Sequence, residues 1–355
     1  STHALSSAAS DVYKRQPSAS QIKGPTIQEY DQEGVVAPYN IDPIAQSEGW
    51  DGLLDPMIAA VHKCQNNSGP YCAAPVNIHR IDWMWANKAV FDANGISVPT
   101  SWDELNAAAE KLQAAGIIPF AHGGQAWQDA TVFEAVAMGI GGNNYYKNCY
   151  VDLKETCLRS ETTVKVFDQM RKLQGFTDEG SPGRDWNVAT GMVIEGKAGF
   201  QIMGDWAKGE FTAAGKVPGV DYYCAATPSN NGYLYNVDSF IFYKTSDPDK
   251  QEGQKLLAKL MMGKNFQKVF NLYKGSIPAR LDVPMDEFDK CAKTSNSDIK
   301  TAGASGGLVP SFAHGMAQGN TMKAALQDVI TEHFNSDMSS VDAANALADS
   351  VLDNM

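Results

Sequence analysis

Polar and aromatic residues gather at the turns that follow apparent strands, which is where α/β proteins build binding sites. An aromatic ring with a few fixed polar groups is the usual lining of a small-molecule pocket. This mixture suits a sugar, whose C–H face stacks on a ring and whose hydroxyls bond charged or amide groups. The residues in this setting are Lys23, Asn77, His79, Arg80, His122, Gln125, Trp127, Asp205, Trp206, Asn236, Asp238, Lys274 and His314.

Asn236 and Asp238 form the most specific pair in this set. They lie two positions apart on a predicted strand, so they are expected to share one face. A carboxylate and an amide on one face can hold two neighbouring hydroxyls.

Simpler roles are open for several of these residues. Trp206 can be a core side chain or an aromatic plate, although Gly204 and Asp205 indicate a turn. Trp83 and Trp85 alternate in IDWMWAN and are predicted core residues. Other members of the set can have purely structural roles. His79 and His122 can be buried histidines with satisfied hydrogen bonds, and Trp127 can be a core indole. Lys23 can be a solvated loop lysine, and Asp205 can be a turn or cap residue.

Signals of catalysis are weak. A P-loop, an H-E-x-x-H motif and a G-x-G-x-x-G motif are absent from the sequence, and its histidines lack metal-ligand spacing. We therefore expect no enzyme, no metal and no cofactor. A secreted carbohydrate-active enzyme such as a glycosidase stays an alternative, because carboxylates are plentiful.

Composition predicts a soluble globular protein. The 355 residues are 43% hydrophobic and 20% charged, which is enough for one large or two ordinary domains. The formal net charge of −12 argues against a nucleic-acid partner, which would need a basic face. No apolar run is long enough to span a membrane.

The six cysteines point to an oxidising compartment. Cys64 and Cys72 flank one turn-rich loop, and Cys149 and Cys157 flank another. Local pairing leaves Cys224 with Cys291, and we predict these three disulfides. Buried thiols are the alternative.

Helical and strand patterns alternate along the chain, which favours an α/β fold. One predicted helix begins at the Thr100-Ser101 cap and ends at Gly116, and a second begins near Asp129. Three further helices are predicted at 249–262, 321–335 and 341–352. Predicted strands cover 117–121 and 197–204. In the helix 249–262, Leu256, Leu257, Leu260 and Met261 are expected to face inward.

Longer motifs carry a family resemblance. The segments QIKGPTIQEY, APVNIHRIDWMWANKAVFDANGI, AHGGQAWQDATVFEAV, GKAGFQIMGDWAKGE, YNVDSF, VFNLYKGSIPAR and PSFAHGMA resemble periplasmic solute-binding proteins of ABC sugar importers. They look most similar to the glucose-binding proteins of Gram-negative bacteria. The similarity runs from about Ser20 to the last residue.

The resemblance implies a two-lobe, doubly wound fold of the type II-like periplasmic class, with a hinge. The first lobe would hold 17–78 and 236–307, and the second 79–235 and 308–355. Residues 1–16 match nothing in the family, and we expect a leader without regular structure. The family has a strand, a helix and a strand before QIKG, with a tandem Trp and an acid that touch the sugar, so the first lobe is expected to be incomplete.

The resemblance also implies a function and a site. The chain would be a monomeric periplasmic protein that closes around glucose or a related hexose and delivers it to two importer membrane subunits. A sugar sensor linked to a chemoreceptor is an alternative. The implied ligand-binding residues are Lys23, Asp205, Trp206, Asn236, Asp238, Lys274 and His314, with His79, Gln125 and Trp127 as further candidates.

Overall fold

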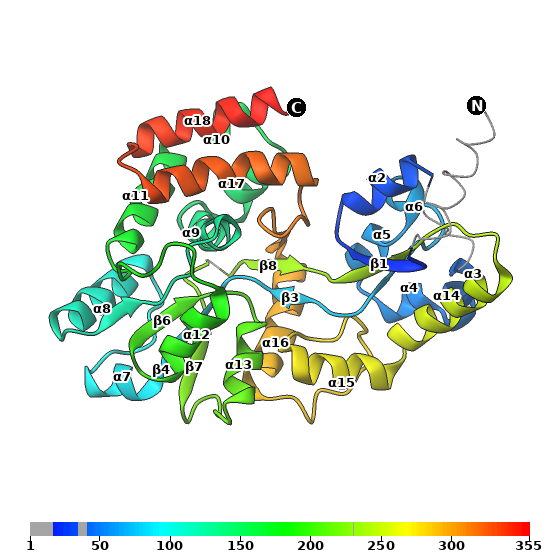
Figure 1. Cartoon of the computed structure of the whole chain (residues 1–355), viewed down its shortest axis with the longest axis horizontal. Helices are drawn as coiled ribbons and strands as arrows, with labels where there is room; N and C mark the ends of the chain where they lie inside the picture. Colours follow the sequence, from blue (N-terminus) through cyan, green and yellow to red (C-terminus); the bar gives the residue numbers. More distant parts are fainter. Residues whose placement is uncertain (1–16, 35–40, 230) are drawn as a thin grey trace, which may run out of the picture. The chain divides into compact units, whose positions relative to one another are not determined.

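The computed structural model describes residues 17–34, 41–229 and 231–355 (Figure 1). The leader expected at 1–16 lies outside these residues. The chain divides into two compact units. Unit 1 comprises the described residues up to Asn77 together with Val237–Val269 and Pro278–Val283, and unit 2 comprises Ile78–Asn236, Phe270–Ile277 and Pro284–Met355.

Unit 1 is built on an antiparallel sheet of order β1-β9-β2, in which β9 pairs with both neighbours. Ile27 and Ile241 are buried beside the disulfide of Cys64 and Cys72. Its elements are β1 (Ala19–Ile22), α2 (Thr26–Gln32), α3 (Asp42–Glu48), α4 (Trp50–Leu53), α5 (Pro56–Val61), α6 (Cys64–Asn67), β2 (Ala73–Pro75), β9 (Ser239–Phe242) and α14 (Pro248–Met261). Helix α15 (Lys264–Lys274) begins in unit 1 and ends in unit 2.

Unit 2 holds two sheets, of orders β5-β6-β4-β7 and β10-β8-β3. Parallel pairs (β5 with β6, β10 with β8) lie beside antiparallel ones, so both sheets are mixed. Its elements are β3 (His79–Arg80), β4 (Trp83–Asn87), α7 (Lys88–Ala93), α8 (Trp102–Ala114), β5 (Ile118–Phe120), α9 (Ala126–Tyr146), the π-helical turn η2 (Lys147–Val151), α10 (Glu155–Leu158), α11 (Glu161–Gln174), α12 (Trp186–Ile194), β6 (Ala198–Ile202), α13 (Ala207–Ala213), β7 (Tyr222–Ala226), β8 (Tyr233–Asn236), α16 (Lys290–Ser305), β10 (Leu308–Pro310), α17 (Asn320–Asn335) and α18 (Ser340–Asp353).

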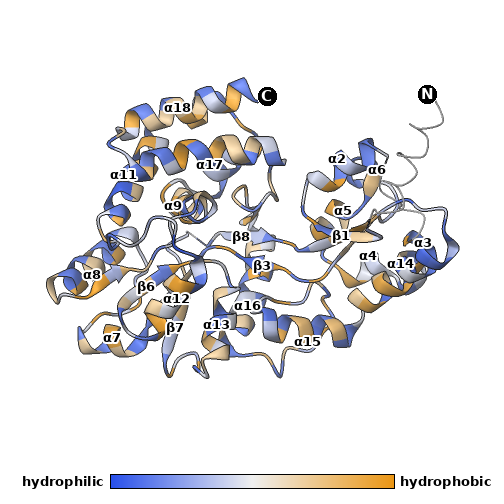
Figure 2. Cartoon of the chain, in the orientation of Figure 1, coloured by the Kyte–Doolittle hydropathy of each residue, from blue (hydrophilic) through white to orange (hydrophobic). Residues whose placement is uncertain are grey.

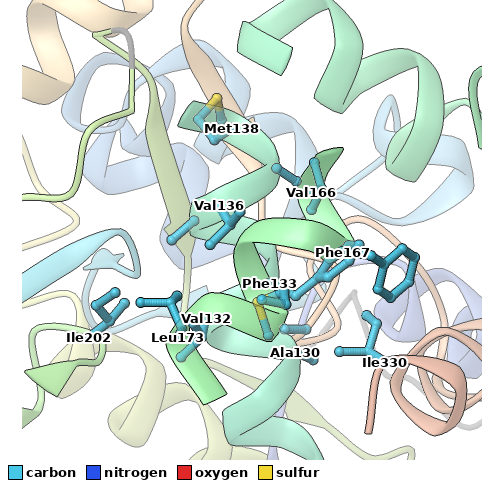
Figure 3. Close-up of a cluster of buried hydrophobic side chains, with 14 of the residues drawn as sticks. Ala130, Val132, Phe133, Val136, Met138, Val166, Phe167, Leu173, Ile202 and Ile330 are labelled. Carbon is cyan, nitrogen blue, oxygen red and sulfur yellow. The ribbon is translucent and has the colours of Figure 1, made fainter. Parts of the chain in front are cut away.

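The largest core of unit 2 surrounds α9, whose residues from Gln128 to Met138 are all buried. A helix that is apolar on most of its sides must be covered all round. Figure 3 shows Phe133 of α9 near Phe167 of α11, and the two rings are 5.0 Å apart. Helices α11 and α17 pack on α9, and they carry mixed polar and apolar residues in Figure 2, as partly exposed helices do.

Several predicted elements are confirmed. Helix α8 begins after Ser101, whose hydroxyl accepts the N–H of Glu104, and the chain leaves it through Gly116 with φ +74°. Strands β5 and β6 and helices α17 and α18 occupy their predicted segments. Trp83 and Trp85 are buried in β4, as predicted.

The inward face predicted for 249–262 is wrong in part. Leu256 and Leu260 are 60% and 57% exposed, whereas Gln254, Ala258 and Met261 are buried. Gln254 donates to the carbonyls of Ser18 and Tyr243, each at 2.7 Å. These two hydrogen bonds fix the rotation of α14 and turn the two leucines outward.

The expected lobe boundaries also differ from the compact units. Residues 270–277 and 284–307 cluster with unit 2 rather than with the first lobe. The reason for the second segment is that α16 packs on β8 and β10, and Cys291 at its start is joined to Cys224 of β7.

All six cysteines form the predicted bridges, Cys64–Cys72, Cys149–Cys157 and Cys224–Cys291. Among the described residues, the helices are all too short or too polar to cross a bilayer.

Candidate functional site

The turn between β6 and α13 is fastened to β3 through Asp205. This acid is only 3% exposed. Its Oδ1 contacts Nδ1 of His79, and its Oδ2 accepts the N–H of Arg80 at 3.0 Å. Its own N–H donates to the carbonyl of Arg80 at 2.9 Å. Both carboxylate oxygens of Asp205 are therefore used to hold the turn that carries Trp206.

Two glycines allow close approaches at this turn. A Cβ on Gly204 would lie 2.2 Å from the Trp206 ring, so the indole lies directly over the backbone of Gly204. Gly275 has φ +91°, and a Cβ there would lie 2.4 Å from the carbonyl of Asp205. The segment after Lys274, at the end of α15, therefore packs on the same turn.

Four rings from separate segments form an aromatic cluster in unit 2, namely His79, Trp127, Trp206 and His314. The Trp206 ring lies 5.0 Å from His314, 5.3 Å from His79 and 6.3 Å from Trp127. Trp127 and His314 are 5.9 Å apart. His79 is buried, whereas Trp127, Trp206 and His314 are partly exposed. The structure thus brings these four predicted residues together.

Helix α9 carries Trp127 of this cluster and also contacts His314 through Thr131. The Thr131 hydroxyl donates its proton to the carbonyl of Trp127 at 2.7 Å, and it lies 2.9 Å from Nε2 of His314. Because the hydroxyl has one proton, it accepts from Nε2–H, which fixes the tautomer of His314. Gln125 accepts the indole N–H of Trp127 at 2.8 Å and donates to Asp185 at 2.7 Å.

His122 has the simpler role that was left open for it. It is buried, stacks on Phe120 and lies 2.7 Å from Asp129 through Nε2.

Asn236 lies opposite His79 in the pairing of β8 with β3. It is 1% exposed, and its buried Oδ1 has no hydrogen-bond partner among the residues that the structure describes. A buried acceptor without a partner is uncommon in native proteins and requires an explanation.

Unit 1 contains a polar cluster around Asp238, made by Gln21, Lys23, Asn77 and Asp238. The carboxylate accepts from Nε2 of Gln21 at 2.9 Å and from Nδ2 of Asn77 at 3.0 Å. Lys23 Nζ lies 3.3 Å away, with a side chain that is 29% exposed. The N–H of Asp238 donates to Oδ1 of Asn77 at 2.9 Å.

The prediction that Asn236 and Asp238 share a strand face is wrong. Strand β8 ends at Asn236 and β9 begins at Ser239, so Asp238 lies in the connection between them. The amide of Asn77 binds both the backbone and the side chain of Asp238 and so sets its orientation instead.

Sequence reasoning missed Gln21, Thr131 and Glu134. Gln21 lies on β1 two positions before Lys23, and that spacing was a usable signal. Thr131 and Glu134 lie within a helix, where a hydroxyl and an acid look like ordinary surface residues.

One catalytic pattern was also overlooked. The G-x-S-x-G pattern of serine hydrolases occurs at 303–307. A nucleophile elbow needs a strand before the serine and a helix after it, whereas Ser305 ends α16 and precedes β10. Its hydroxyl donates to the carbonyl of Thr301 at 3.1 Å, so the local structure is a helix end.

With both clusters described, the comparisons with known proteins identify the family. The sequence matches the model of the bacterial extracellular solute-binding proteins over residues 8–261. The chain belongs to this family. This confirms the family prediction made from the motifs.

Named relatives of this solute-binding protein are similar over nearly its whole length. It is 44% identical to the "Probable sugar-binding periplasmic protein" of Brucella suis, over 94% of this chain and 78% of the relative. It is 43% identical to the protein of the same name from Rhizobium meliloti, over 94% of this chain and 80% of the relative.

Solved structures share the fold of this solute-binding protein. The solute receptor AcbH, whose structure reports a preference for β-D-galactopyranose, matches with a TM-score of 0.80 at 18% identity, over 95% of this chain and 84% of that one. A chitin oligosaccharide binding protein matches with a TM-score of 0.80 at 18% identity, over 98% and 85% of the two chains. At this identity the matches support the α/β periplasmic-binding fold alone.

Proposed function

We propose that this protein binds a hexose, such as glucose, outside the cytoplasmic membrane and delivers it to the membrane subunits of an ABC importer. The observation that carries the proposal is the partly exposed aromatic cluster of Trp206, Trp127 and His314, which lies beside the buried pair of His79 and Asp205. The relatives named as sugar-binding periplasmic proteins support the same ligand class.

Trp206 supplies the plate for the sugar. Its indole lies over the backbone of Gly204, which limits its rotation before any ligand arrives. A ring that is already ordered loses little conformational entropy on binding. The C–H face of a pyranose stacks on this ring and removes apolar surface of both partners from water.

In this proposal, polar side chains bind the hydroxyl groups of the sugar. The Oδ1 of Asn236 gains its missing partner when a hydroxyl donates to it. Asp238 accepts a second hydroxyl and Lys23 donates to a third, with charge-assisted strength. Lys274 and His314 complete the proposed set, and Gln125 orients Trp127.

Asp205 acts through its neighbours in this proposal. Both of its oxygens bind within the protein, to His79 and to Arg80. Its part is to hold the turn of Trp206 and the ring of His79 in place.

The three disulfides support an extracytoplasmic location, since such bonds persist in oxidising compartments. The proposed transport role is binding and release without chemical change of the sugar. A sugar that binds one conformation of the protein better shifts the population toward that conformation, and this is the proposed signal to the importer.

Calorimetric titration against a panel of mono- and disaccharides tests the function. We expect a hexose to bind the wild-type protein and to be recovered intact, whereas cleavage would indicate a glycosidase. Trp206→Ala should weaken binding at least tenfold, because it removes the stacking surface. Leu352→Ala in α18, where the side chain is 44% exposed, is the control and should bind as the wild type does.

The part of Asp238 in sugar binding is tested separately from that of the aromatic cluster. Asp238→Asn in unit 1 should weaken binding of the same hexose that Trp206→Ala affects. Unchanged affinity in Asp238→Asn would remove the unit 1 cluster from the site and leave the aromatic cluster as the binding surface.

A further inference from the structure

Glu134 is a fully buried acid that none of the preceding steps uses. It lies on α9, one turn after Thr131, and is 0% exposed. Its Oε1 lies 2.6 Å from Oγ of Ser311. Its Oε2 accepts the hydroxyl proton of Tyr146 at 3.0 Å and the N–H of Ala313 at 3.3 Å. A buried acid with three partners holds those partners in a fixed arrangement.

All of these contacts converge on the segment that carries His314. The Ser311 hydroxyl accepts the N–H of His314 at 3.1 Å. The Tyr146 hydroxyl accepts the N–H of Phe312 at 3.1 Å and lies 3.1 Å from the carbonyl of Pro310. The backbone from Pro310 to His314 is therefore attached to α9 at several points.

The same helix also contacts the imidazole of His314, through Thr131. Glu134 contacts the backbone segment of His314 and Thr131 contacts its ring, so two residues one turn apart on the same helix determine where this side chain lies. The rings of Trp206 and Trp127 pack against the imidazole of His314, with ring centres 5.0 Å and 5.9 Å from it.

We infer that Glu134 is a positioning residue for the sugar site, which acts through Ser311 to hold His314 against the aromatic cluster. The inference rests on the proposed function in one respect, namely that His314 contacts the sugar. The placement of His314 itself does not depend on that function.

The protonation state of Glu134 decides which substitution preserves the network. Burial raises its pKa to about 8, so the carboxyl group is mostly neutral at pH 7. The Ser311 hydroxyl donates to Oε1 when the acid is ionised, whereas in the neutral form a proton on Oε1 donates to Oγ of Ser311 instead; Oε2 accepts from Tyr146 and Ala313 in both forms. Gln reproduces this pattern with its amide N–H₂ and carbonyl. Leu leaves the N–H of Ala313 without its acceptor and removes the partner of the Ser311 hydroxyl, whereas the Tyr146 hydroxyl keeps the carbonyl of Pro310.

The test compares Glu134→Gln and Glu134→Leu in two backgrounds, wild type and His314→Ala. D-glucose is titrated first, followed by D-galactose and D-xylose if glucose does not bind. We expect Glu134→Gln to bind within threefold of the wild type and Glu134→Leu to bind at least tenfold more weakly. In the His314→Ala background the effect of Glu134→Leu should fall below twofold. An equal loss in both backgrounds, or no loss in either, would overturn the inference.

A ligand-free measurement separates this inference from the proposed function. The ring protons of His314 are shifted in NMR spectra by the currents of the two neighbouring indoles. Glu134→Leu should move these resonances, and Glu134→Gln should leave them in place. If the wild type binds no sugar but the resonances still move, the function fails and the positioning role stands.

Ser311→Ala covers the case in which Glu134→Leu does not fold. It removes the hydroxyl that links Glu134 to the N–H of His314, while Tyr146 and Ala313 keep their contacts with Oε2. The same displacement of the His314 resonances is expected, and unchanged resonances would contradict the inference.

Discussion

Two buried acids, Asp205 and Glu134, each accept a hydrogen bond from a backbone N–H group. Asp205 accepts the N–H of Arg80, and Glu134 accepts the N–H of Ala313. In each case the acid fastens a short segment that carries an aromatic residue of the site, Trp206 or His314. Because these acids hold backbone, their replacement is expected to displace the site without removing any group that touches a ligand.

The raised pKa of Glu134 predicts a pH dependence of stability. An unfolded chain loses this proton near pH 4.5, whereas the folded protein keeps it up to about pH 8. Folding therefore retains a proton in this window, and stability falls as pH rises, by at most about 1.4 kcal/mol per pH unit. The Glu134→Gln variant has no carboxyl proton at this position, so its stability lacks this part of the pH dependence.

Urea unfolding at pH 5 and at pH 8 measures the effect. We expect the free energy of unfolding of Glu134→Gln to rise relative to the wild type by at least about 2 kcal/mol between these pH values. The remaining titrating groups are common to both proteins and cancel in the difference. A difference that does not change with pH would show that Glu134 is ionised throughout.

Gly204 makes a second prediction at the residue scale. A Cβ there would meet the Trp206 ring at 2.2 Å, so Gly204→Ala must displace the indole. Because the obstacle is the end of a side chain, the fold should survive while hexose affinity falls at least fivefold. Gly303→Ala in α16 is the control, since a Cβ there meets no described heavy atom within 4 Å. Equal affinities in calorimetry would contradict the role given to Trp206.

Residue types at turns and element starts predicted members of the aromatic cluster, whereas Thr131 and Glu134 in the middle of α9 gave no signal. The turn Gly204-Asp205-Trp206 and the motif SFAHGM pointed to rings that the structure brings together. The contacts of Glu134 with Ser311 join residues 177 positions apart, and local sequence carries no record of such a pair. The same limit explains the error at Asp238, whose partner Asn77 lies 161 positions away.

At the scale of elements, the disulfides differ in what they connect. Cys224–Cys291 joins β7 to the start of α16, with a sequence separation of 67. Cys149–Cys157 closes a local loop after α9, with a separation of 8. In the chain-entropy description, the longer loop restricts the unfolded chain more strongly.

Paired substitutions of these cysteines by alanine test that difference. Cys224→Ala with Cys291→Ala should lower the free energy of unfolding by about 4 kcal/mol, and Cys149→Ala with Cys157→Ala by about 2.5 kcal/mol. Guanidinium unfolding of the two variants against the wild type measures both. A larger loss for the local bridge would indicate that packing around η2, rather than loop closure, dominates.

Secondary structure was predictable where capping and periodicity agreed. Helix α8 has a serine cap, acids in its first turn and a glycine exit, so its limits followed from the sequence. Helix α14 has an equally clear cap at Asp247, but its rotation depends on the hydrogen bonds of Gln254 to Ser18 and Tyr243. Such tertiary hydrogen bonds override the choice of the most apolar face.

At the scale of the whole molecule, the chain is divided unequally. Unit 1 is the smaller unit and is assembled from separate stretches of sequence. A smaller unit buries a smaller fraction of its surface and is less stable for that reason. We therefore expect the two units to open with different free energies.

Hydrogen exchange without ligand tests this expectation. Amides of β1, β2 and β9 should exchange faster than those of α9 and β4, by at least tenfold. Removing the Cys64–Cys72 bridge by two alanine substitutions should accelerate exchange in unit 1 while leaving α9 unchanged. Acceleration of all these amides together would mean that the chain unfolds as one cooperative body.

The closeness of Trp127 and Trp206 has a practical consequence. Two indoles whose centres are 6.3 Å apart couple electronically, and both residues are partly exposed. A solute that contacts either ring is expected to change the emission intensity and the near-ultraviolet dichroism of the pair. We therefore expect the pair to serve as a built-in optical reporter, with which binding of an unlabelled solute could be followed in real time in a cuvette.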